Sequence, residues 1–132
     1  MKKLTLIFTL LFSTVMFSSS SYADWTKISS NEKATIYIDL DTITHRDGYV
    51  YWWDLSNLSK PGPQGILSAV TLRQGDCNLF RYKVLSDRFY SKPMGRGSPF
   101  LSSDTPDKHW RYTEPNDTNT HKFISLKLVC NK

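Results

Sequence analysis

Two cysteines, Cys77 and Cys130, carry the most distinctive chemistry in this chain of 132 residues. A pair of thiols can form a disulfide, hold a metal ion or supply a nucleophile, and the redox compartment decides among these uses. A zinc site would also need histidines, but His45, His109 and His121 lie apart, without C-x-x-C or H-x-x-x-H spacing. We therefore predict no metal site.

The amino-terminus predicts export. Lys2 and Lys3 precede a mostly apolar run over residues 4–17, and Ser21 and Ala23 are small residues at the two positions that a signal peptidase reads. The run is about 14 residues long, whereas a membrane-spanning helix needs roughly 18 to 20. We interpret residues 1–23 as a cleaved signal peptide, expect no transmembrane segment, and assign residues 24–132 to one domain.

Export decides the chemistry of the cysteines. In the oxidising periplasm or outside the cell, two cysteines in one small domain most simply form one disulfide, Cys77 to Cys130. In the chain-entropy model such a bridge is worth on the order of 4 kcal/mol. No cysteine lies near the predicted cleavage site, so we expect the mature chain to lack a lipid anchor.

Catalytic patterns are absent from the sequence. Asp39 and Asp41 are spaced as a carboxylate pair, but aspartates where a strand runs into a turn more often cap the turn. The sequence has no G-x-S-x-G and no H-E-x-x-H motif. We predict a non-enzymatic protein with no catalytic residue and no cofactor.

Basic residues concentrate in one part of the chain. Between residues 73 and 96, six of them face only Asp76 and Asp87, a local charge of +4; they are Arg73, Arg81, Lys83, Arg88, Lys92 and Arg96. They could guard a solvated sheet face against edge pairing, or attract an acidic protein or an anionic polysaccharide. The candidate ligand-binding residues are Arg73, Arg81, Lys83 and Arg88.

Nucleic acid is excluded as a partner by charge. The chain has 17 basic and 12 acidic residues, and loss of Lys2 and Lys3 leaves only +3. Aromatic stacking on single strands also needs a strongly basic groove. Four tryptophans could instead stack on sugars, although most aromatics in a small domain fill the core; they are Trp25, Trp52, Trp53 and Trp110.

Period-2 alternation of apolar residues dominates the chain and predicts an antiparallel sheet. Predicted strands cover residues 34–40, 49–58, 66–73 and 80–87, with Val70 and Leu72 facing inward and Thr71 and Arg73 outward. The Pro- and Gly-rich stretches at 60–65 and 92–99 break the pattern.

The C-terminal segment fits two structures. Residues 123–130 contain an apolar side suited to a helix, which Asp117 or Thr118 could cap, but Ile124, Leu126 and Leu128 also alternate as in a strand. Propensity leaves the two open. A helix on one face of the sheet, tied to it by Cys130, would give the sheet the cover that it needs.

Short motifs in a fixed order carry a resemblance to a known family. They are YID at 37–39, SAVTLRxGDC at 68–77, FY at 89–90, GRG at 95–97, the proline at 115 and LVC at 128–130. The chain resembles the surface-adhesin protein E family of Gram-negative bacteria over essentially its whole mature length. That resemblance implies an α+β fold, a single antiparallel sheet with a C-terminal helix packed on one face and disulfide-bonded to it.

The resemblance also implies a function in binding. The family binds host extracellular-matrix and plasma proteins such as laminin, vitronectin and plasminogen, through a basic segment before the first bridge cysteine, where this chain carries only Arg73. We therefore expect an exported, adhesin-like binding protein of the periplasm or cell surface. A periplasmic accessory protein and a secreted enzyme inhibitor are the alternatives, and a homodimer is a further candidate assembly.

Overall fold

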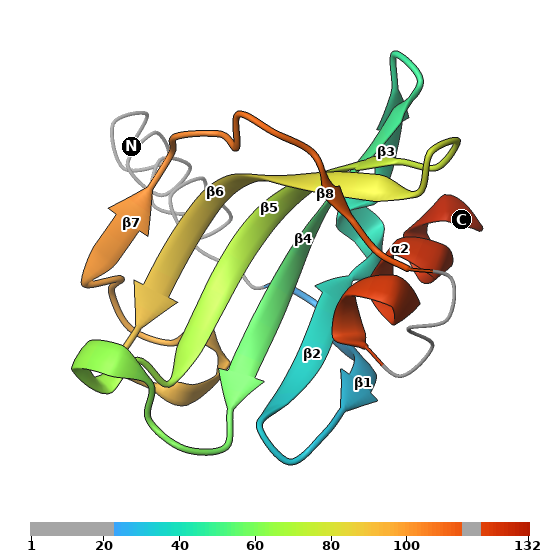
Figure 1. Ribbon diagram of the computed structural model, residues 1–132. Helices are drawn as coiled ribbons and strands as arrows, with labels where there is room; N and C mark the ends of the chain where they lie inside the picture. The colour runs from blue at the N-terminus through green and yellow to red at the C-terminus, as the bar shows by residue number, and fades with distance from the viewer. Residues whose placement is uncertain (1–22, 115–119) are drawn as a thin grey trace, which may run out of the picture.

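The described part of the chain forms one antiparallel sheet with an α-helix, α2 (His121–Cys130), packed on one face (Figure 1). The computed structural model describes residues 23–114 and 120–132, so the predicted signal peptide lies almost wholly outside the described residues. The strands are β1 (Trp25–Ser30), β2 (Ala34–Asp39), β3 (Thr44–Arg46), β4 (Tyr49–Leu58), β5 (Ser68–Asp76), β6 (Arg81–Tyr90), β7 (Leu101–Ser103) and β8 (Arg111–Tyr112). The predicted α+β class is confirmed.

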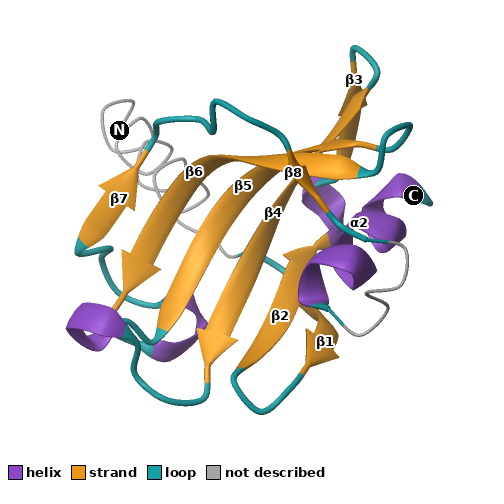
Figure 2. Cartoon of the chain, viewed as in Figure 1, coloured by secondary structure: helices purple, strands orange, loops and turns teal. Residues whose placement is uncertain are grey.

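The strand order along the sheet is β1-β2-β4-β5-β6-β7, with β3 paired to the start of β4 and β8 to the start of β6. The turn between β3 and β4 is a two-residue hairpin in which Asp47 and Gly48 both have positive φ, 53° and 83°. Asp-Gly suits such a turn because both positions require the left-handed region. Strands β3 and β8 extend the sheet at the end where β5 leads to Cys77 (Figure 2).

The ambiguous C-terminal segment is a helix. Its cap is Thr120, whose side chain accepts a hydrogen bond from the backbone N–H of Phe123 at 3.2 Å, whereas the predicted caps Asp117 and Thr118 lie outside the described residues. Leu126 and Val129 are fully buried against Trp52 and its neighbours in the core. Burial at i and i+3 is the pattern of a helix face, which excludes the strand alternative.

Helix α2 is fastened to the sheet at both ends. The predicted Cys77–Cys130 disulfide is confirmed and holds the last residue of the helix beside the end of β5. At the first residue, the Nδ1 atom of His121 is hydrogen-bonded to the Oγ atom of Ser29 on β1. The helix lies over β1 and β2, while much of β4, β5 and β6 has no helix in front of it (Figure 1).

The opposite face of the sheet is covered by a short turn, η3 (Pro93–Gly95). Gly95 approaches the side chains of Val70 and Leu55, and its N–H donates a hydrogen bond to the Oγ atom of Ser68 at 2.9 Å. Both faces of β5 are therefore packed, at least in part, and neither is a free solvated face.

The predicted orientation of β5 is wrong for two residues. Thr71 is only 4% exposed, and Arg73 lies on the α2 face because it pairs in register with Trp52 and Val84. A bulge between Leu72 and Arg73 shifts the register with β6. The shift also places Asp87 beside Thr71, whose hydroxyl donates to the Asp87 carboxylate at 2.8 Å.

Gly75 permits the close approach of α2. A Cβ atom at this position would lie 2.9 Å from both Leu126 Cδ1 and Val50 Cγ1, below any ordinary contact distance. We predict that Gly75→Ala destabilises the protein by about 1 to 3 kcal/mol, the usual cost of overpacking a core. Urea unfolding followed by tryptophan fluorescence measures the change.

Gly62→Ala is the matched control. Its φ is ordinary, and the added Cβ would meet the flexible end of Leu58 at 3.2 Å, outside the helix contact. We expect a clearly smaller loss than for Gly75→Ala. Equal losses of stability in the two variants would contradict the role assigned to Gly75.

Candidate functional site

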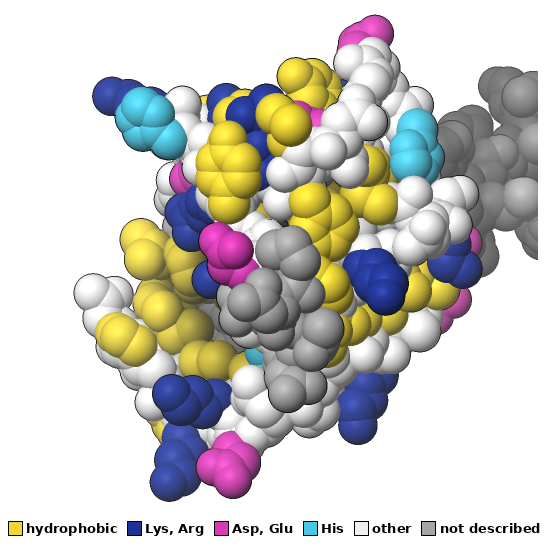
Figure 3. All heavy atoms as spheres, turned by 45° about the vertical axis from the view of Figure 1, so that its right-hand side comes forward, with side chains coloured by type: hydrophobic (Ala, Val, Ile, Leu, Met, Phe, Trp, Pro, Cys, Tyr) yellow, Lys and Arg dark blue, Asp and Glu magenta, His cyan; other side chains and the backbone are white. Residues whose placement is uncertain are grey.

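The four predicted ligand-binding residues do not form one patch. Arg73 lies on the α2 face, whereas Arg81 and Lys83 pair with Asp76 and Gln74 on the other face. Arg88 pairs with Val70, farther along that second face. Figure 3 shows Lys and Arg side chains spread around the visible side of the molecule rather than gathered in one place. The candidate residues therefore belong to two separate regions, one on each face of the sheet.

The first region, here called the basic–aromatic surface, consists of Tyr49, Arg81, Lys83, Trp110 and Tyr112. The guanidinium carbon of Arg81 lies 4.4 Å from the centre of the Trp110 ring, and the Nζ atom of Lys83 lies 4.8 Å from it. Tyr49 packs against the same ring with centroids 5.5 Å apart. Cations and rings are therefore interleaved where β4, β6 and β8 begin.

Arg81 is held in place by an ion pair. Its Nε atom donates to Asp76 Oδ2 at 2.8 Å, and its Nη1 atom donates to the Tyr112 hydroxyl at 3.1 Å. Burial tends to raise the pKa of Asp76, but the hydrogen bond from Arg81 and two backbone N–H groups leave that pKa below its ordinary value. Asp76 therefore stays ionised and offsets the charge of Arg81.

Lys83 supplies the uncompensated charge of this surface. No ion pair to Lys83 occurs within residues 23–114 and 120–132. Arg88, by contrast, donates to Ser86 at 2.6 Å and pairs with Asp104 at 2.8 Å, and the hydrogen bonds of these two residues lower the pKa of Asp104. Arg88 thus connects β6 to the segment after β7 and lies apart from the Trp110 ring.

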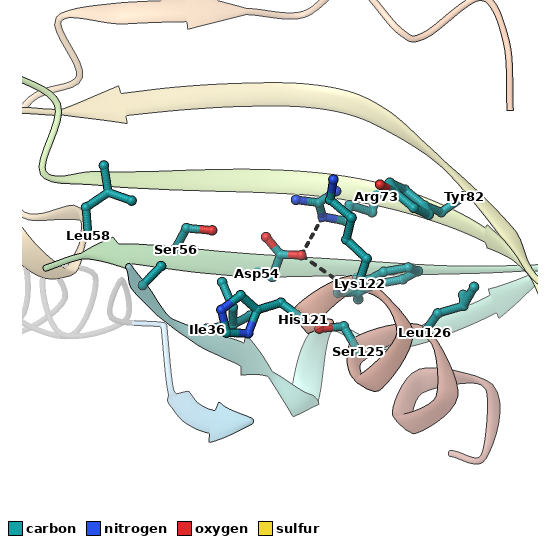
Figure 4. Close-up of a pocket in the computed structure, with 12 residues that line it drawn as sticks. Ile36, Asp54, Ser56, Leu58, Arg73, Tyr82, His121, Lys122, Ser125 and Leu126 are labelled. Atoms are coloured by element: carbon teal, nitrogen blue, oxygen red, sulfur yellow. Dashed lines mark hydrogen bonds and ion pairs between the residues drawn. The ribbon is translucent and has the colours of Figure 1, made fainter. Parts of the chain in front are cut away.

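The second region is a pocket of about 190 Å³ between the start of α2 and the sheet (Figure 4). Its apolar lining comes from Ala34, Ile36, Trp52 and Leu58. The polar lining comes from β4, β5 and α2; it comprises Asp54, Ser56, Arg73, His121, Lys122 and Ser125.

An ion pair lies at the base of the pocket. The Nε atom of Arg73 donates to Asp54 Oδ2 at 2.5 Å, and the indole N–H of Trp52 donates to the same oxygen at 3.3 Å. The Arg73 side chain is 17% exposed and the Asp54 side chain is 3% exposed. Burial raises the pKa of Asp54 above its ordinary value, because it outweighs the attraction of Arg73.

Two buried polar atoms of the pocket residues have no partner among the described residues: Asp54 Oδ1 and His121 Nε2. Burial also lowers the pKa of His121, so its imidazole is neutral over a wider pH range than a free histidine. A buried acceptor without a partner costs free energy unless water or a ligand satisfies it. The pocket therefore contains two polar atoms whose hydrogen-bonding capacity a water molecule or a ligand could satisfy.

Other predicted candidates have structural roles. Asp39 caps the short 3-10 turn η1 (Leu40–Thr42) by accepting from the Asp41 N–H at 3.2 Å, as the capping interpretation predicts. Trp52 is buried beneath α2, and Trp53 is half-buried on the other face. No cluster of three or more metal-ligating side chains occurs in the described part of the chain.

Sequence patterns did not identify the Asp54–Arg73 pair. Its one signal was an acidic residue inside the aromatic run YVYWWDLSNL, where a strand packed on both faces has no room for an unpaired charge. The partner could not be chosen because the register of β4 with β5, which pairs Trp52 with Arg73 and Asp54 with Thr71, decides which side Arg73 faces. Trp110 was named only as a candidate for stacking on sugars, and Tyr112 was missed as a surface residue because β8 is only two residues long.

The fold and these two regions define a small disulfide-bonded α+β binding domain. A family model described as surface-adhesin protein E matches residues 25–131, and the chain belongs to that family. The family is one of surface adhesins, which places the chain among binding proteins. No helix among the described residues is long and apolar enough to span a bilayer.

Solved structures of protein E from Haemophilus influenzae share the fold. Crystal form II is 18% identical, with a TM-score of 0.59, and the match covers 86% of this chain and 91% of that one. The selenomethionine form is 16% identical with the same TM-score and the same coverage of both chains. Protein E from a non-typeable strain is 15% identical, with a TM-score of 0.53, and covers 86% and 79%. A search of curated proteins found no match.

The buried ion pair generates a stability prediction. Arg73→Met would leave the Asp54 carboxylate buried without its cation, which costs about 3 kcal/mol or more. Asp54→Leu should cost less, because Arg73 is 17% exposed and can turn toward water. The double variant should be more stable than Arg73→Met alone, since no buried charge remains. Urea unfolding of the three variants measures this cycle.

Arg88→Met is the control for this cycle. It breaks the Arg88–Asp104 pair, in which Asp104 is 72% exposed, and exposed pairs contribute little to stability. We expect little change in this variant. Additive losses from Arg73→Met and Asp54→Leu would show that the two groups are not coupled.

Proposed function

We propose that this chain is an exported adhesin that binds host extracellular-matrix or plasma proteins, such as laminin, vitronectin or plasminogen, through the basic–aromatic surface. Family membership supports the class of function, and the contacts around Trp110 support the choice of surface. The proposal keeps Arg81 and Lys83 as ligand-binding residues. Arg73 is paired with Asp54 and Arg88 with Asp104, so neither is proposed to contact the host protein.

One observation carries the choice of surface: the rings and cations are already held together before a partner binds. Tyr, Trp and Arg are the residue types that most often dominate the binding energy of protein interfaces. Tyr112 is 63% exposed, and its hydroxyl already accepts from Arg81. Side chains that are ordered beforehand lose less conformational entropy when a partner binds.

An anionic polysaccharide is the second candidate ligand, because Lys83 offers a charge without an ion pair in the described residues. If such a ligand were held by charge alone, its affinity would fall strongly as salt is added, since the Debye length is about 10 Å at 0.1 M and shortens as the salt concentration rises. A periplasmic accessory role and a secreted enzyme inhibitor are the functional alternatives. Cell fractionation separates them from adhesion: a surface protein supports the proposal, and a strictly periplasmic one contradicts it.

The proposal predicts a loss of binding on substitution. Arg81→Gln/Lys83→Gln should weaken binding to immobilised laminin or vitronectin by roughly thirtyfold, because two charged contacts each contribute on the order of 1 kcal/mol. Surface plasmon resonance at low and moderate salt measures the effect. Analytical ultracentrifugation of the same samples reports whether the protein is a monomer or a homodimer.

Lys27→Gln/Lys127→Gln is the matched control. It removes the same net charge from the groove between β1 and α2, away from the Trp110 ring. Tyr112→Ala adds a second comparison, because it should weaken binding to a matrix protein but leave heparin binding nearly unchanged. If Arg81→Gln/Lys83→Gln and Lys27→Gln/Lys127→Gln weaken the binding of every ligand equally, binding is non-specific charge attraction and the proposed surface is wrong.

A further inference from the structure

We propose that the pocket between α2 and the sheet binds a small α-amino acid with an apolar side chain, whose ammonium group meets Asp54 and whose carboxylate meets Arg73 and Lys122. This site is separate from the basic–aromatic surface, which lies on the other face of the sheet and on different residues. Loss of either site can therefore be measured without loss of the other.

The free acceptor at the base of the pocket calls for a donor. Asp54 is 2% exposed, its Oδ2 atom is occupied by Arg73 and Trp52, and its Oδ1 atom has no partner among the described residues. In Figure 4 that free oxygen is turned toward the side of the pocket where Ser56 lies. A charged donor on the ligand would satisfy it better than the neutral donor of a water molecule.

Two cations beside the same pocket call for an anionic group. The terminal nitrogens of Arg73 make no hydrogen bond within the described part of the chain, since only its Nε atom is engaged by Asp54. Lys122 extends from the first turn of α2 on the same side of the pocket as Arg73 (Figure 4). An α-amino acid carries its ammonium and carboxylate on one carbon, which matches an acceptor and a donor that are direct neighbours.

The remaining lining sets the size and polarity of the ligand. Ala34, Ile36 and Leu58 form an apolar wall beyond Asp54. A cavity of roughly 150 Å³ holds a ligand as large as benzene, so a pocket of about 190 Å³ suits the side chain of leucine. Burial that lowers the pKa of His121 also keeps a third cation out of the pocket near neutral pH.

An NMR titration of the purified protein with three probes tests the site. L-leucine carries both charges, leucinamide lacks the carboxylate, and 4-methylpentanoate lacks the amine. We expect saturable shifts of the Trp52 indole N–H and of the Ile36 and Leu58 methyl groups with L-leucine. Each truncated probe should bind roughly tenfold more weakly, because it loses one charge-assisted contact.

Two lysine variants on the same helix sharpen the test. Lys122→Gln should weaken the binding of L-leucine severalfold and leave the binding of leucinamide unchanged. Lys127 lies outside the pocket, so Lys127→Gln should change the affinity for neither probe. Ala34→Leu, which fills the pocket, should abolish the shifts while the protein still binds laminin. The proposal is overturned if L-leucine gives no saturable shift, which would leave the pocket to water, or if all three probes bind equally, which would show an unselective apolar cavity.

Discussion

Helix α2 is too short for the sheet face that it covers, and most features of this protein depend on that mismatch. A helix of ten residues is about 15 Å long, whereas the ten residues of β4 extend over roughly 33 Å. The Cys77–Cys130 disulfide fixes the helix at the end of β5, over Gly75 and Trp52. The part of the face beyond the start of the helix is left as a pocket.

The partial cover explains where charge is tolerated inside the sheet. Asp54 and Arg73 lie at the boundary between the face packed by α2 and the open part, so the carboxylate is buried while the guanidinium still reaches solvent. On the other side of the sheet, η3 covers the last part of β4 and the first part of β5, and leaves their Cys77 end free. Trp110 and its two cations occupy that end. The two faces of the sheet thus present two unlike surfaces, a small polar pocket and a broad basic–aromatic surface.

Local pattern predicted the sheet but could not predict what each strand faces. The aromatic run at 49–58 is β4, as its alternation predicts, and the geometry of the Asp-Gly turn before it is set by two residues alone. Strand β1 gave no alternation, since a bulge between Lys27 and Ser29 interrupts it. The pocket needs the register of β4 with β5, the register shift between β5 and β6, and the start of α2, which lie far apart in the sequence. Propensity did not distinguish a helix from a strand at 123–130; the need to cover one face of the sheet and the family resemblance favoured the helix.

The disulfide holds α2 on the sheet and thereby shapes the pocket. Hydrogen–deuterium exchange of the native protein, with the bridge intact and after reduction, measures this segment by segment. Reduction should speed exchange in residues 126–130 before it affects β4 and β5, because only the C-terminal end of the helix loses its covalent link. Unchanged protection of α2 in the reduced protein, or simultaneous loss in α2 and β4, would contradict the account.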